Sequence, residues 1–315
     1  MKTISNPWLK LREGINQEDY DVIHALEERC IREDHIALKL ELDYKLAVSS
    51  STGSTRSAGI RKTNEFMYFD GQELIGYIGI CEFGDASTPL EVNGMVHPEY
   101  RRQGVFETLS RLVLDEWKRR APKSLLLLSD RKSEAGQTFI QGTGAEYHHS
   151  EYEMYLQMDR SDIHSDIEGL AFRKATNADA REIGRQNAIY FGAEPPEEEL
   201  SGLPSEGIIQ PEEEEKRGMT IFLAEIDGQI IGKVHVQLSL GGTGGIYGLG
   251  VLPEHRGKGY GRAMLLKAVA KLKEARAKEI MLQVAVENAN ALGLYQSCGF
   301  EETSTMDYYE LSVQS

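Results

Sequence analysis

The segment Arg256–Gly261 (Arg-Gly-Lys-Gly-Tyr-Gly) combines three glycines with two cations where a strand pattern gives way to a helix pattern. Glycines let the backbone turn tightly and approach a ligand without a Cβ atom in the way. Backbone N–H groups at the start of a helix, together with the positive end of its dipole, favour a bound anion such as a pyrophosphate. The segment therefore predicts an anion-binding turn.

Two other glycine-rich phosphate motifs are excluded by spacing. A P-loop requires Ser or Thr directly after Gly-Lys, whereas Gly257-Lys258 is followed by Gly259. The dinucleotide fingerprint requires a third glycine at the position that Met264 occupies. Both motifs also need a strand–helix–strand unit, whereas the tight-turn pair Asp227-Gly228 indicates a hairpin ahead of the glycine turn.

The pattern around this turn occurs twice in the chain. Val96–Phe106 (VHPEYRRQGVF) matches Val251–Gly261 (VLPEHRGKGYG), with Val, Pro, Glu, Arg and Gly recurring at a constant offset of 155 positions. The same offset places Gly144 on Gly299. A period of this length fits a duplicated domain rather than a solenoid repeat. We therefore expect one domain at 1–158 and a second at 169–315, joined by a polar linker at 159–168.

Each half is expected to contain the same order of elements. In the first half, strands are predicted at 9–13, 65–69, 73–82, 91–96, 125–128 and 146–158, with helices at 16–42, 104–120 and 134–141. In the second, strands are predicted at 170–174, 220–226, 230–238, 246–251, 280–284 and 300–311, with helices at 178–191, 260–277 and 289–297. The expected fold class is mixed α/β, each domain being a mostly antiparallel mixed sheet flanked by helices.

Composition narrows the class of protein. The 315 residues carry a formal net charge of −15, which argues against a nucleic-acid partner. The longest purely apolar run is Leu125–Leu128, far below the ~18 residues of a membrane-spanning helix. The three cysteines form neither a disulfide framework nor a Cys-x-x-Cys pair. We expect a cytoplasmic globular protein without a metal or a membrane partner.

The Arg-x-x-Gly-x-Gly turn resembles the acetyl-CoA-binding motif of the GCN5-related N-acetyltransferase (GNAT) superfamily. Downstream, Asn288–Phe300 is similar to that superfamily's N-x-x-A-x-x-L-Y-x-x-x-G-F segment, with Asn288, Tyr295 and Phe300 in place. The resemblance covers 169–315 well and the first half more loosely. The duplicated layout resembles the tandem acetyltransferases of the superfamily.

This resemblance implies transfer of an acetyl group from acetyl-CoA to a primary amine, with the chemistry in the second half. It implies that Tyr295 protonates the leaving thiolate and that Asn288 contacts the pantetheine arm. The backbone amides of Leu249, Gly250 and Val251 would hold the pantetheine and polarise the thioester carbonyl, as an oxyanion hole does. The other residues expected to bind the co-substrate are Arg256, Gly257, Lys258, Gly259, Tyr260, Gly261 and Arg262.

The first half departs from the motif at three positions. Phe106 takes the place of Gly261, where a pyrophosphate would approach closely. Ser133 replaces the Asn, and Ile140 replaces the Tyr. We therefore expect the first half to be a structural partner that helps to complete the acceptor cleft. The chain would then be a pseudo-dimer within one monomer.

The base and the acceptor stay open at this stage. His235 and Glu225 are candidate bases, a water chain is an equal alternative, and Gln283 stands where relatives carry a carboxylate. The acceptor would be a small-molecule or peptide amine. The acidic runs 194–199 and 212–215 either attract it or form a solvated loop. A non-catalytic acyl-CoA-binding or sensing protein is the alternative function.

Overall fold

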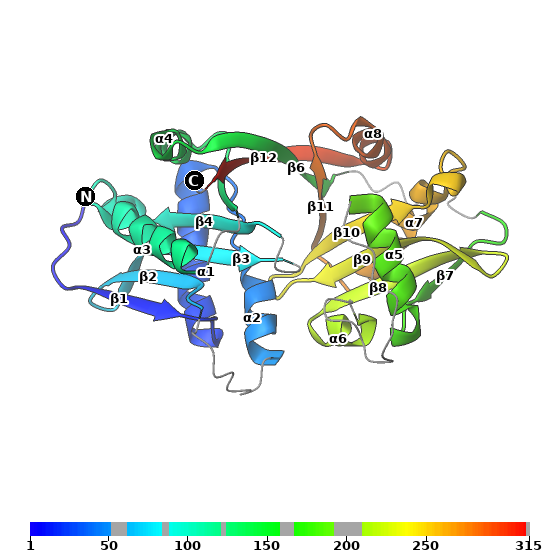
Figure 1. Ribbon diagram of the computed structural model, residues 1–315, viewed down its shortest axis with the longest axis horizontal. Coiled ribbons are helices and arrows are strands. Elements are labelled where there is room, and N and C mark those ends of the chain that lie inside the picture. Colours follow the sequence, from blue (N-terminus) through cyan, green and yellow to red (C-terminus); the bar gives the residue numbers. More distant parts are fainter. Residues whose placement is uncertain (52–61, 84–87, 121–123, 158–166, 192–209, 313–315) are drawn as a thin grey trace. The chain divides into compact units, whose positions relative to one another are not determined.

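The computed structural model describes residues 1–51, 62–83, 88–120, 124–157, 167–191 and 210–312, which fall into two compact units (Figure 1). The first unit consists of Met1–Glu151 together with Ser304–Ser315, and the second of Tyr152–Thr303. The end of each sequence repeat therefore belongs to the unit built mainly from the other repeat. The domain limits expected from the duplication stay a prediction, and 158–166 of the expected linker lies outside the described residues.

The first unit has a mixed sheet in the order β1-β2-β3-β4-β5-β12. Neighbouring strands are antiparallel except β4 and β5, which run parallel. The strands are β1 (Pro7–Arg12), β2 (Glu65–Asp70), β3 (Glu73–Glu82), β4 (Leu90–Val96), β5 (Leu125–Asp130) and, from the end of the chain, β12 (Phe300–Leu311). The helices are α1 (Gln17–Asp34), α2 (Leu42–Ser51), α3 (Val105–Arg119) and α4 (Glu134–Thr143).

Helices pack on both faces of this sheet because successive side chains of a strand point to opposite faces. Ile78 and Ile80 of β3 lie in one core cluster with Leu109 and Val113 of α3. Tyr77 of the same strand lies in a second cluster that contains residues of α1. The sheet is therefore buried on both sides.

The second unit repeats this arrangement with a sheet in the order β6-β11-β10-β9-β8-β7. Its strands are β7 (Ala171–Lys174), β8 (Met219–Ile226), β9 (Gln229–Leu238), β10 (Thr243–Val251), β11 (Glu279–Ala285) and the end of β6 (Glu146–Leu156). The helices are α5 (Ala180–Phe191), α6 (Pro211–Lys216), α7 (Tyr260–Glu274) and α8 (Ala289–Ser297).

The two faces of β9 carry different chemistry. Val234 and Val236 pack in the main core with Leu265 and Val269 of α7. The side chains that alternate with them, including Lys233, face the side covered by α5. One face of the strand is therefore apolar, and the other buries a cation.

The predicted strands and the main helices are confirmed, and two regions differ. The predicted helix 16–42 ends at Asp34 because His35 adopts a left-handed conformation with φ 53°, and a separate helix α2 follows. The acidic run 212–215 forms the short helix α6 instead of a loop. The other acidic run, 194–199, lies outside the described residues.

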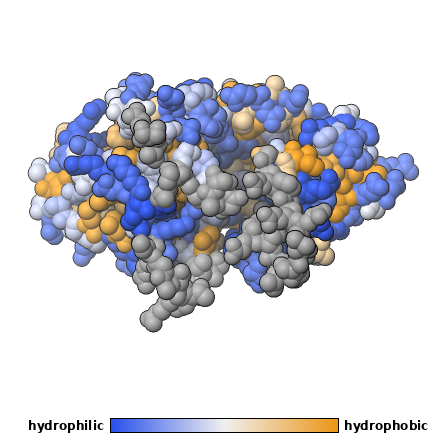
Figure 2. All heavy atoms as spheres, in the orientation of Figure 1, coloured by the Kyte–Doolittle hydropathy of each residue, from blue (hydrophilic) through white to orange (hydrophobic). Residues whose placement is uncertain are grey.

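The face drawn in Figure 2 is covered mostly by hydrophilic side chains, with hydrophobic ones scattered between them. Within the part of the chain that the structure describes, no helix is both long and apolar enough to span a bilayer.

Candidate functional site

The glycine turn connects the end of β10 to the start of α7. Gly257 and Gly259 have φ values of 74° and 85°, in the left-handed region that glycine adopts without strain. Gly259 is the N-cap residue of α7 and provides no side-chain hydrogen bond, and the first turn of the helix contains no acidic residue. The N–H groups of this turn therefore form a positive helix end that suits an anion.

Three cations surround the turn, and they have different partners. The Nε atom of Arg256 donates a hydrogen bond to the Val251 carbonyl oxygen at 2.9 Å, and no carboxylate among the described residues pairs with this guanidinium. Lys258 is exposed. Arg262 donates to the Ser297 hydroxyl at 2.8 Å and so ties α7 to the end of α8. Of the three cations that the sequence predicts to bind the co-substrate, Arg256 and Lys258 are thus the ones available to a phosphate group, and their role stays a prediction.

Gly261 lies where α7, β10 and α8 meet. A Cβ atom at this position would lie 3.4 Å from Cδ2 of Leu294 and 3.8 Å from Cγ2 of Val251. A methyl group would thus be in ordinary contact, but a large side chain would have to displace these neighbours. The close approach of two helices and a strand therefore limits the size of a side chain here independently of any ligand, without requiring glycine.

The strand β10 is irregular at Leu249, the first of the three residues predicted to bind pantetheine, whereas Gly250 and Val251 pair with Lys233 and Gly232 of β9. Its pairing with β11 ends at Ile246, and its pairing with β9 is interrupted between Tyr247 and Gly250. The bulge therefore leaves Gly248 and Leu249 without partners in either neighbouring strand. Backbone groups outside the strand pairing can bind the amide groups of a ligand that lies along the strand.

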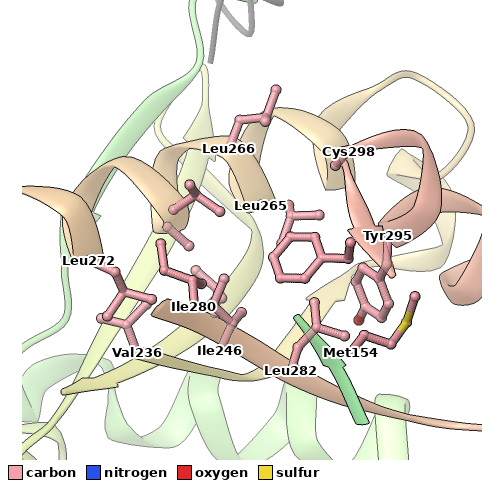
Figure 3. Packing of buried hydrophobic residues seen from close by; sticks show 14 of the residues in the cluster. Met154, Val236, Ile246, Leu265, Leu266, Leu272, Ile280, Leu282, Tyr295 and Cys298 are labelled. Carbon is pink, nitrogen blue, oxygen red and sulfur yellow. The ribbon is translucent and has the colours of Figure 1, made fainter. Parts of the chain in front are cut away.

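Tyr295 lies in the core cluster of the second unit, where Figure 3 shows its ring close to Met154 and Leu282. Its relative exposure is 9%, and burial raises the pKa of its hydroxyl to about 12. None of the described residues forms a hydrogen bond with this hydroxyl. At neutral pH the phenol is therefore protonated and able to donate to a ligand.

Asn288 is the N-cap residue of α8, and its Oδ1 accepts a hydrogen bond from the Ala291 amide at 3.1 Å. The side-chain amide nitrogen stays available as a donor. This hydrogen bond stabilises the N-terminus of α8, the helix that carries Tyr295. Asn288, Leu294 and Tyr295 thus share one short helix, which packs against the ends of α7 and β10.

A buried polar pair lies under the β10 bulge, on the α5 side of the sheet. Nζ of Lys233, which has 0% exposure, is 3.3 Å from Nε2 of His235 and 3.3 Å from the Gly248 carbonyl oxygen. Burial lowers the pKa of Lys233 to about 8, and burial together with this cation lowers the pKa of His235 well below its usual value. Sequence reasoning named His235 but missed Lys233.

The remaining candidate acids are paired elsewhere. Glu225 accepts a hydrogen bond from Arg173 at 2.7 Å, so it is not a free base. In α6, Glu213 pairs with Lys216 and Glu214 with Arg217. Among the described residues, no group of three or more His, Cys, Asp or Glu side chains could hold a metal ion.

The corresponding turn of the first unit is closed by its own residues. Arg101 also donates from Nε to a strand carbonyl, that of Val96, but its guanidinium forms two hydrogen bonds with Asp34 at 2.7 and 2.5 Å. The Phe106 ring packs edge-on against Phe139, with the ring centroids 4.7 Å apart. The first unit thus keeps the turn, but its arginine is paired with a carboxylate and a phenylalanine stands in the place of Gly261.

Comparison with known proteins agrees with this geometry. Residues 187–300 match the model of the acetyltransferase (GNAT) family. The mycothiol acetyltransferase of Pseudarthrobacter chlorophenolicus is 28% identical in an alignment of 244 residues that covers 73% of this chain and 72% of that protein.

Two solved structures have the same fold over nearly the whole chain. A GCN5-related N-acetyltransferase from Sphaerobacter thermophilus is 18% identical, with a TM-score of 0.69 over 98% of this chain and 96% of that one. A tandem GNAT protein from the clavulanic acid biosynthesis pathway is 13% identical, with a TM-score of 0.64 over 98% and 99% of the two chains. This chain is an acetyltransferase, with a domain of the GNAT family at residues 187–300 and the fold of a tandem GNAT protein over nearly its whole length.

Proposed function

We propose that the protein transfers an acetyl group from acetyl-CoA to a primary amine of a small molecule, and that the second unit performs the chemistry. The observation that carries this proposal is the open helix start of α7. It has no side-chain cap, no acid in its first turn and an unpaired Arg256 beside it. These features suit a pyrophosphate, which the family's acetyl-CoA co-substrate contains.

The co-substrate would lie along β10 from the glycine turn toward the bulge. The turn from Arg256 to Gly261 would hold the pyrophosphate, with Lys258 as a second cation. Backbone groups of Gly248 and Leu249, which lie outside the strand pairing, would hold the pantetheine amides. Asn288 would donate its free amide hydrogens to the same arm, while Arg262 would act indirectly by holding α8 against α7.

In the transfer step the amine nitrogen forms a bond to the thioester carbonyl carbon, and the carbon–sulfur bond then breaks. Backbone N–H groups of the bulge would stabilise the charge that develops on the carbonyl oxygen. Tyr295 would give its hydroxyl proton to the thiolate, and the proton that the new amide nitrogen loses balances the one that Tyr295 gives up. The raised pKa of Tyr295 keeps this proton in place before the reaction.

A relative's name supports a small-molecule acceptor, because the Pseudarthrobacter protein is called a mycothiol acetyltransferase. In this chain the carboxylates of α6 do not support an acid patch that attracts a cationic peptide, because they pair within their own unit. The location that we propose is the cytoplasm, since Cys30, Cys81 and Cys298 are all buried and free of disulfide bonds.

The test is release of CoA thiol from acetyl-CoA by the full-length protein over a panel of amino sugars, aminoglycosides, polyamines and peptides. Acetylation of at least one small amine, lost in Tyr295→Phe with acetyl-CoA binding retained, is the expected result. Binding of acetyl-CoA without turnover of any amine would leave a non-catalytic acyl-CoA-binding protein and would overturn the proposal.

A further inference from the structure

We propose that His235 and Lys233 form a proton relay that deprotonates the acceptor amine, with His235 facing the acceptor and Lys233 storing the proton. This inference rests on the proposed function and adds the base that the transfer requires. An amine arrives at neutral pH mostly as an ammonium ion, which has no lone pair for attack on a thioester. A group near the reacting carbonyl must therefore take a proton.

The position of the pair matches this task. Both side chains come from the face of β9 that α5 covers, next to the β10 bulge where the thioester would lie. A Cβ atom at Gly248 would lie 3.3 Å from Nζ of Lys233 and 3.6 Å from Nε2 of His235. Both residues are buried, but His235 is 8% exposed and Lys233 is 0% exposed, so His235 is the more accessible residue of the pair.

The surroundings of Lys233 suit a lysine that changes its charge during the reaction. Among the described residues, no carboxylate pairs with Lys233, and its polar neighbours are Nε2 of His235 and the Gly248 carbonyl oxygen. The rings of Tyr190 and Phe191 lie 5.7 and 5.4 Å from Nζ. A neutral amine can be held by the two polar neighbours, and the ring faces stabilise the cation once the proton has arrived.

The other groups on this side do not compete as bases. Tyr190, from α5, donates its hydroxyl hydrogen to Gln186 at 3.0 Å, and burial raises its pKa. From β8, the residues opposite Lys233 and His235 are Leu223 and Ile221, which are apolar. Lys233 and His235 are thus the basic groups at this place among the described residues.

The relay balances without a further reactant. The ammonium N–H bond breaks as a bond to Nδ1 of His235 forms, and the Nε2–H bond breaks as a third N–H bond forms on Lys233. The imidazole stays neutral and only changes its tautomer, while the positive charge passes to the lysine. The pKa of Lys233, about 8, lies above that of His235, so the proton rests on the lysine. A lysine with a pKa near the working pH can release it again after each turnover.

The test compares full-length wild type with Lys233→Met and His235→Gln in the thiol-release assay, using two amines of different pKa. For the wild type we expect kcat/KM to rise with pH through an inflection near pH 8 that does not move with the amine. Each variant should lower kcat by ~10²–10⁴ and remove this inflection. Lys233→Met should fold, because it replaces an unpaired buried cation by an apolar chain of similar length.

A second readout does not depend on turnover. Nuclear magnetic resonance of protein labelled with ¹³C at lysine Cε should show one signal that titrates near pH 8 and is absent from Lys233→Met. A Lys233 signal that titrates near pH 10.5, or a Lys233→Met variant with wild-type kcat and pH profile, would overturn the relay and leave the proposed function standing. A wild type that binds acetyl-CoA but acetylates no amine would overturn both.

Discussion

The two glycine turns of this protein have one backbone design and different side chains. Gly104 and Gly259 both start a helix with a left-handed φ, and Arg101 and Arg256 both donate from Nε to the last strand carbonyl. Beyond these shared bonds the turns diverge. Duplication has therefore kept the residues that the backbone needs and has changed those that a ligand would meet.

The differences all reduce access to the first turn. Asp34 neutralises Arg101, whereas no described carboxylate pairs with Arg256. Gln103 donates to the Lys2 carbonyl at 2.8 Å and accepts from the Ile4 amide at 3.4 Å, so the start of the chain lies against this turn. The first turn is filled by its own unit, whereas among the described residues only Ile167 lies within 4 Å of where a Cβ atom at Gly259 of the second turn would stand.

The strands that precede the two turns also differ, since the pairing is regular in the first unit and interrupted in the second. In the first unit β4 pairs with β3 without a register shift from Gly76 to Glu82, whereas β10 has a bulge. The first unit also buries a lysine beside its sheet, but Lys45 is paired with Glu65 at 2.9 Å. A paired lysine is a structural cation, and an unpaired one such as Lys233 is a group that can change charge.

The largest effect that separates the two units is expected from loss of one hydroxyl. Tyr295→Phe keeps the ring in the core and should lower kcat by ~10²–10⁴, because the thiolate loses its proton donor. The matched change in the first unit is Tyr309→Phe, which removes a hydroxyl bonded to Gln137 and should leave kcat unchanged. Equal rates for Tyr295→Phe and wild type over the whole pH range would assign Tyr295 to packing alone.

The two buried lysines should respond to the same substitution with opposite sign. At pH 7, Lys45→Met should lower the free energy of unfolding by roughly 3 kcal/mol, because Glu65 loses its partner inside the protein. Lys233→Met should raise it by roughly 1–2 kcal/mol, because the folded state no longer buries an unpaired charge. Denaturant unfolding of both variants measures this difference.

The pH dependence of these two effects also differs in sign. The pKa of Lys233 is lowered to about 8. The destabilisation of the folded state by its buried charge is therefore full below pH 8 and fades as pH rises toward 10.5. For Lys45, burial opposes protonation, but the attraction of Glu65 together with Cys81 and Glu41 outweighs it and raises the pKa. Its contribution is therefore present below pH 10.5 and is lost only above it. A gain from Lys233→Met that did not shrink between pH 8 and 10.5 would contradict this account.

An exchange of the two helix-start residues should change acetyl-CoA affinity in one unit only. Gly261→Phe should weaken binding by ~10–100-fold, since the ring must displace Leu294 and Val251 and would stand in the turn. Phe106→Gly in the first unit should not change the affinity. Calorimetric titration of the full chain measures both, and an unchanged dissociation constant for Gly261→Phe would refute the pyrophosphate assignment.

The smallest effect is expected from substitution of the two equivalent arginines, Arg101 and Arg256. Arg256→Ala should weaken acetyl-CoA binding by roughly fivefold at low salt, and less as salt screens the contact. Arg101→Ala should leave the affinity unchanged and lower the free energy of unfolding by roughly 1 kcal/mol, through loss of the partly exposed pair with Asp34. A loss of affinity in Arg101→Ala as large as that in Arg256→Ala would remove the distinction between the two turns.

The sequence sufficed for features that depend on local patterns. Apolar periodicity and turn residues located the strands and main helices, and the offset of 155 aligned Ser133 with Asn288, which both cap a helix by accepting a hydrogen bond from the amide three residues on. Helix α1 was predicted too long because its end depends on a left-handed His35, a residue type that seldom marks a helix end.

Features that depend on tertiary contacts could not be predicted. Alternation along β9 indicates a buried face, but it does not reveal that no carboxylate within the described part of the chain pairs with Lys233. The exchange of strand ends, which places Tyr152–Leu156 in the second unit and Ser304–Leu311 in the first, leaves no local signal either. It also means that a fragment starting at residue 169 would lack a strand, so every test proposed above uses the full chain.

Hydrogen exchange of the full-length protein with and without acetyl-CoA tests the central claim most directly, because it locates the ligand without any substitution. We predict slower exchange of backbone amides in 248–262, which include the bulge and the open turn, and no change in the matching segment 93–107. Equal protection of both segments, or protection of 93–107 alone, would contradict the assignment of acetyl-CoA binding to the second unit.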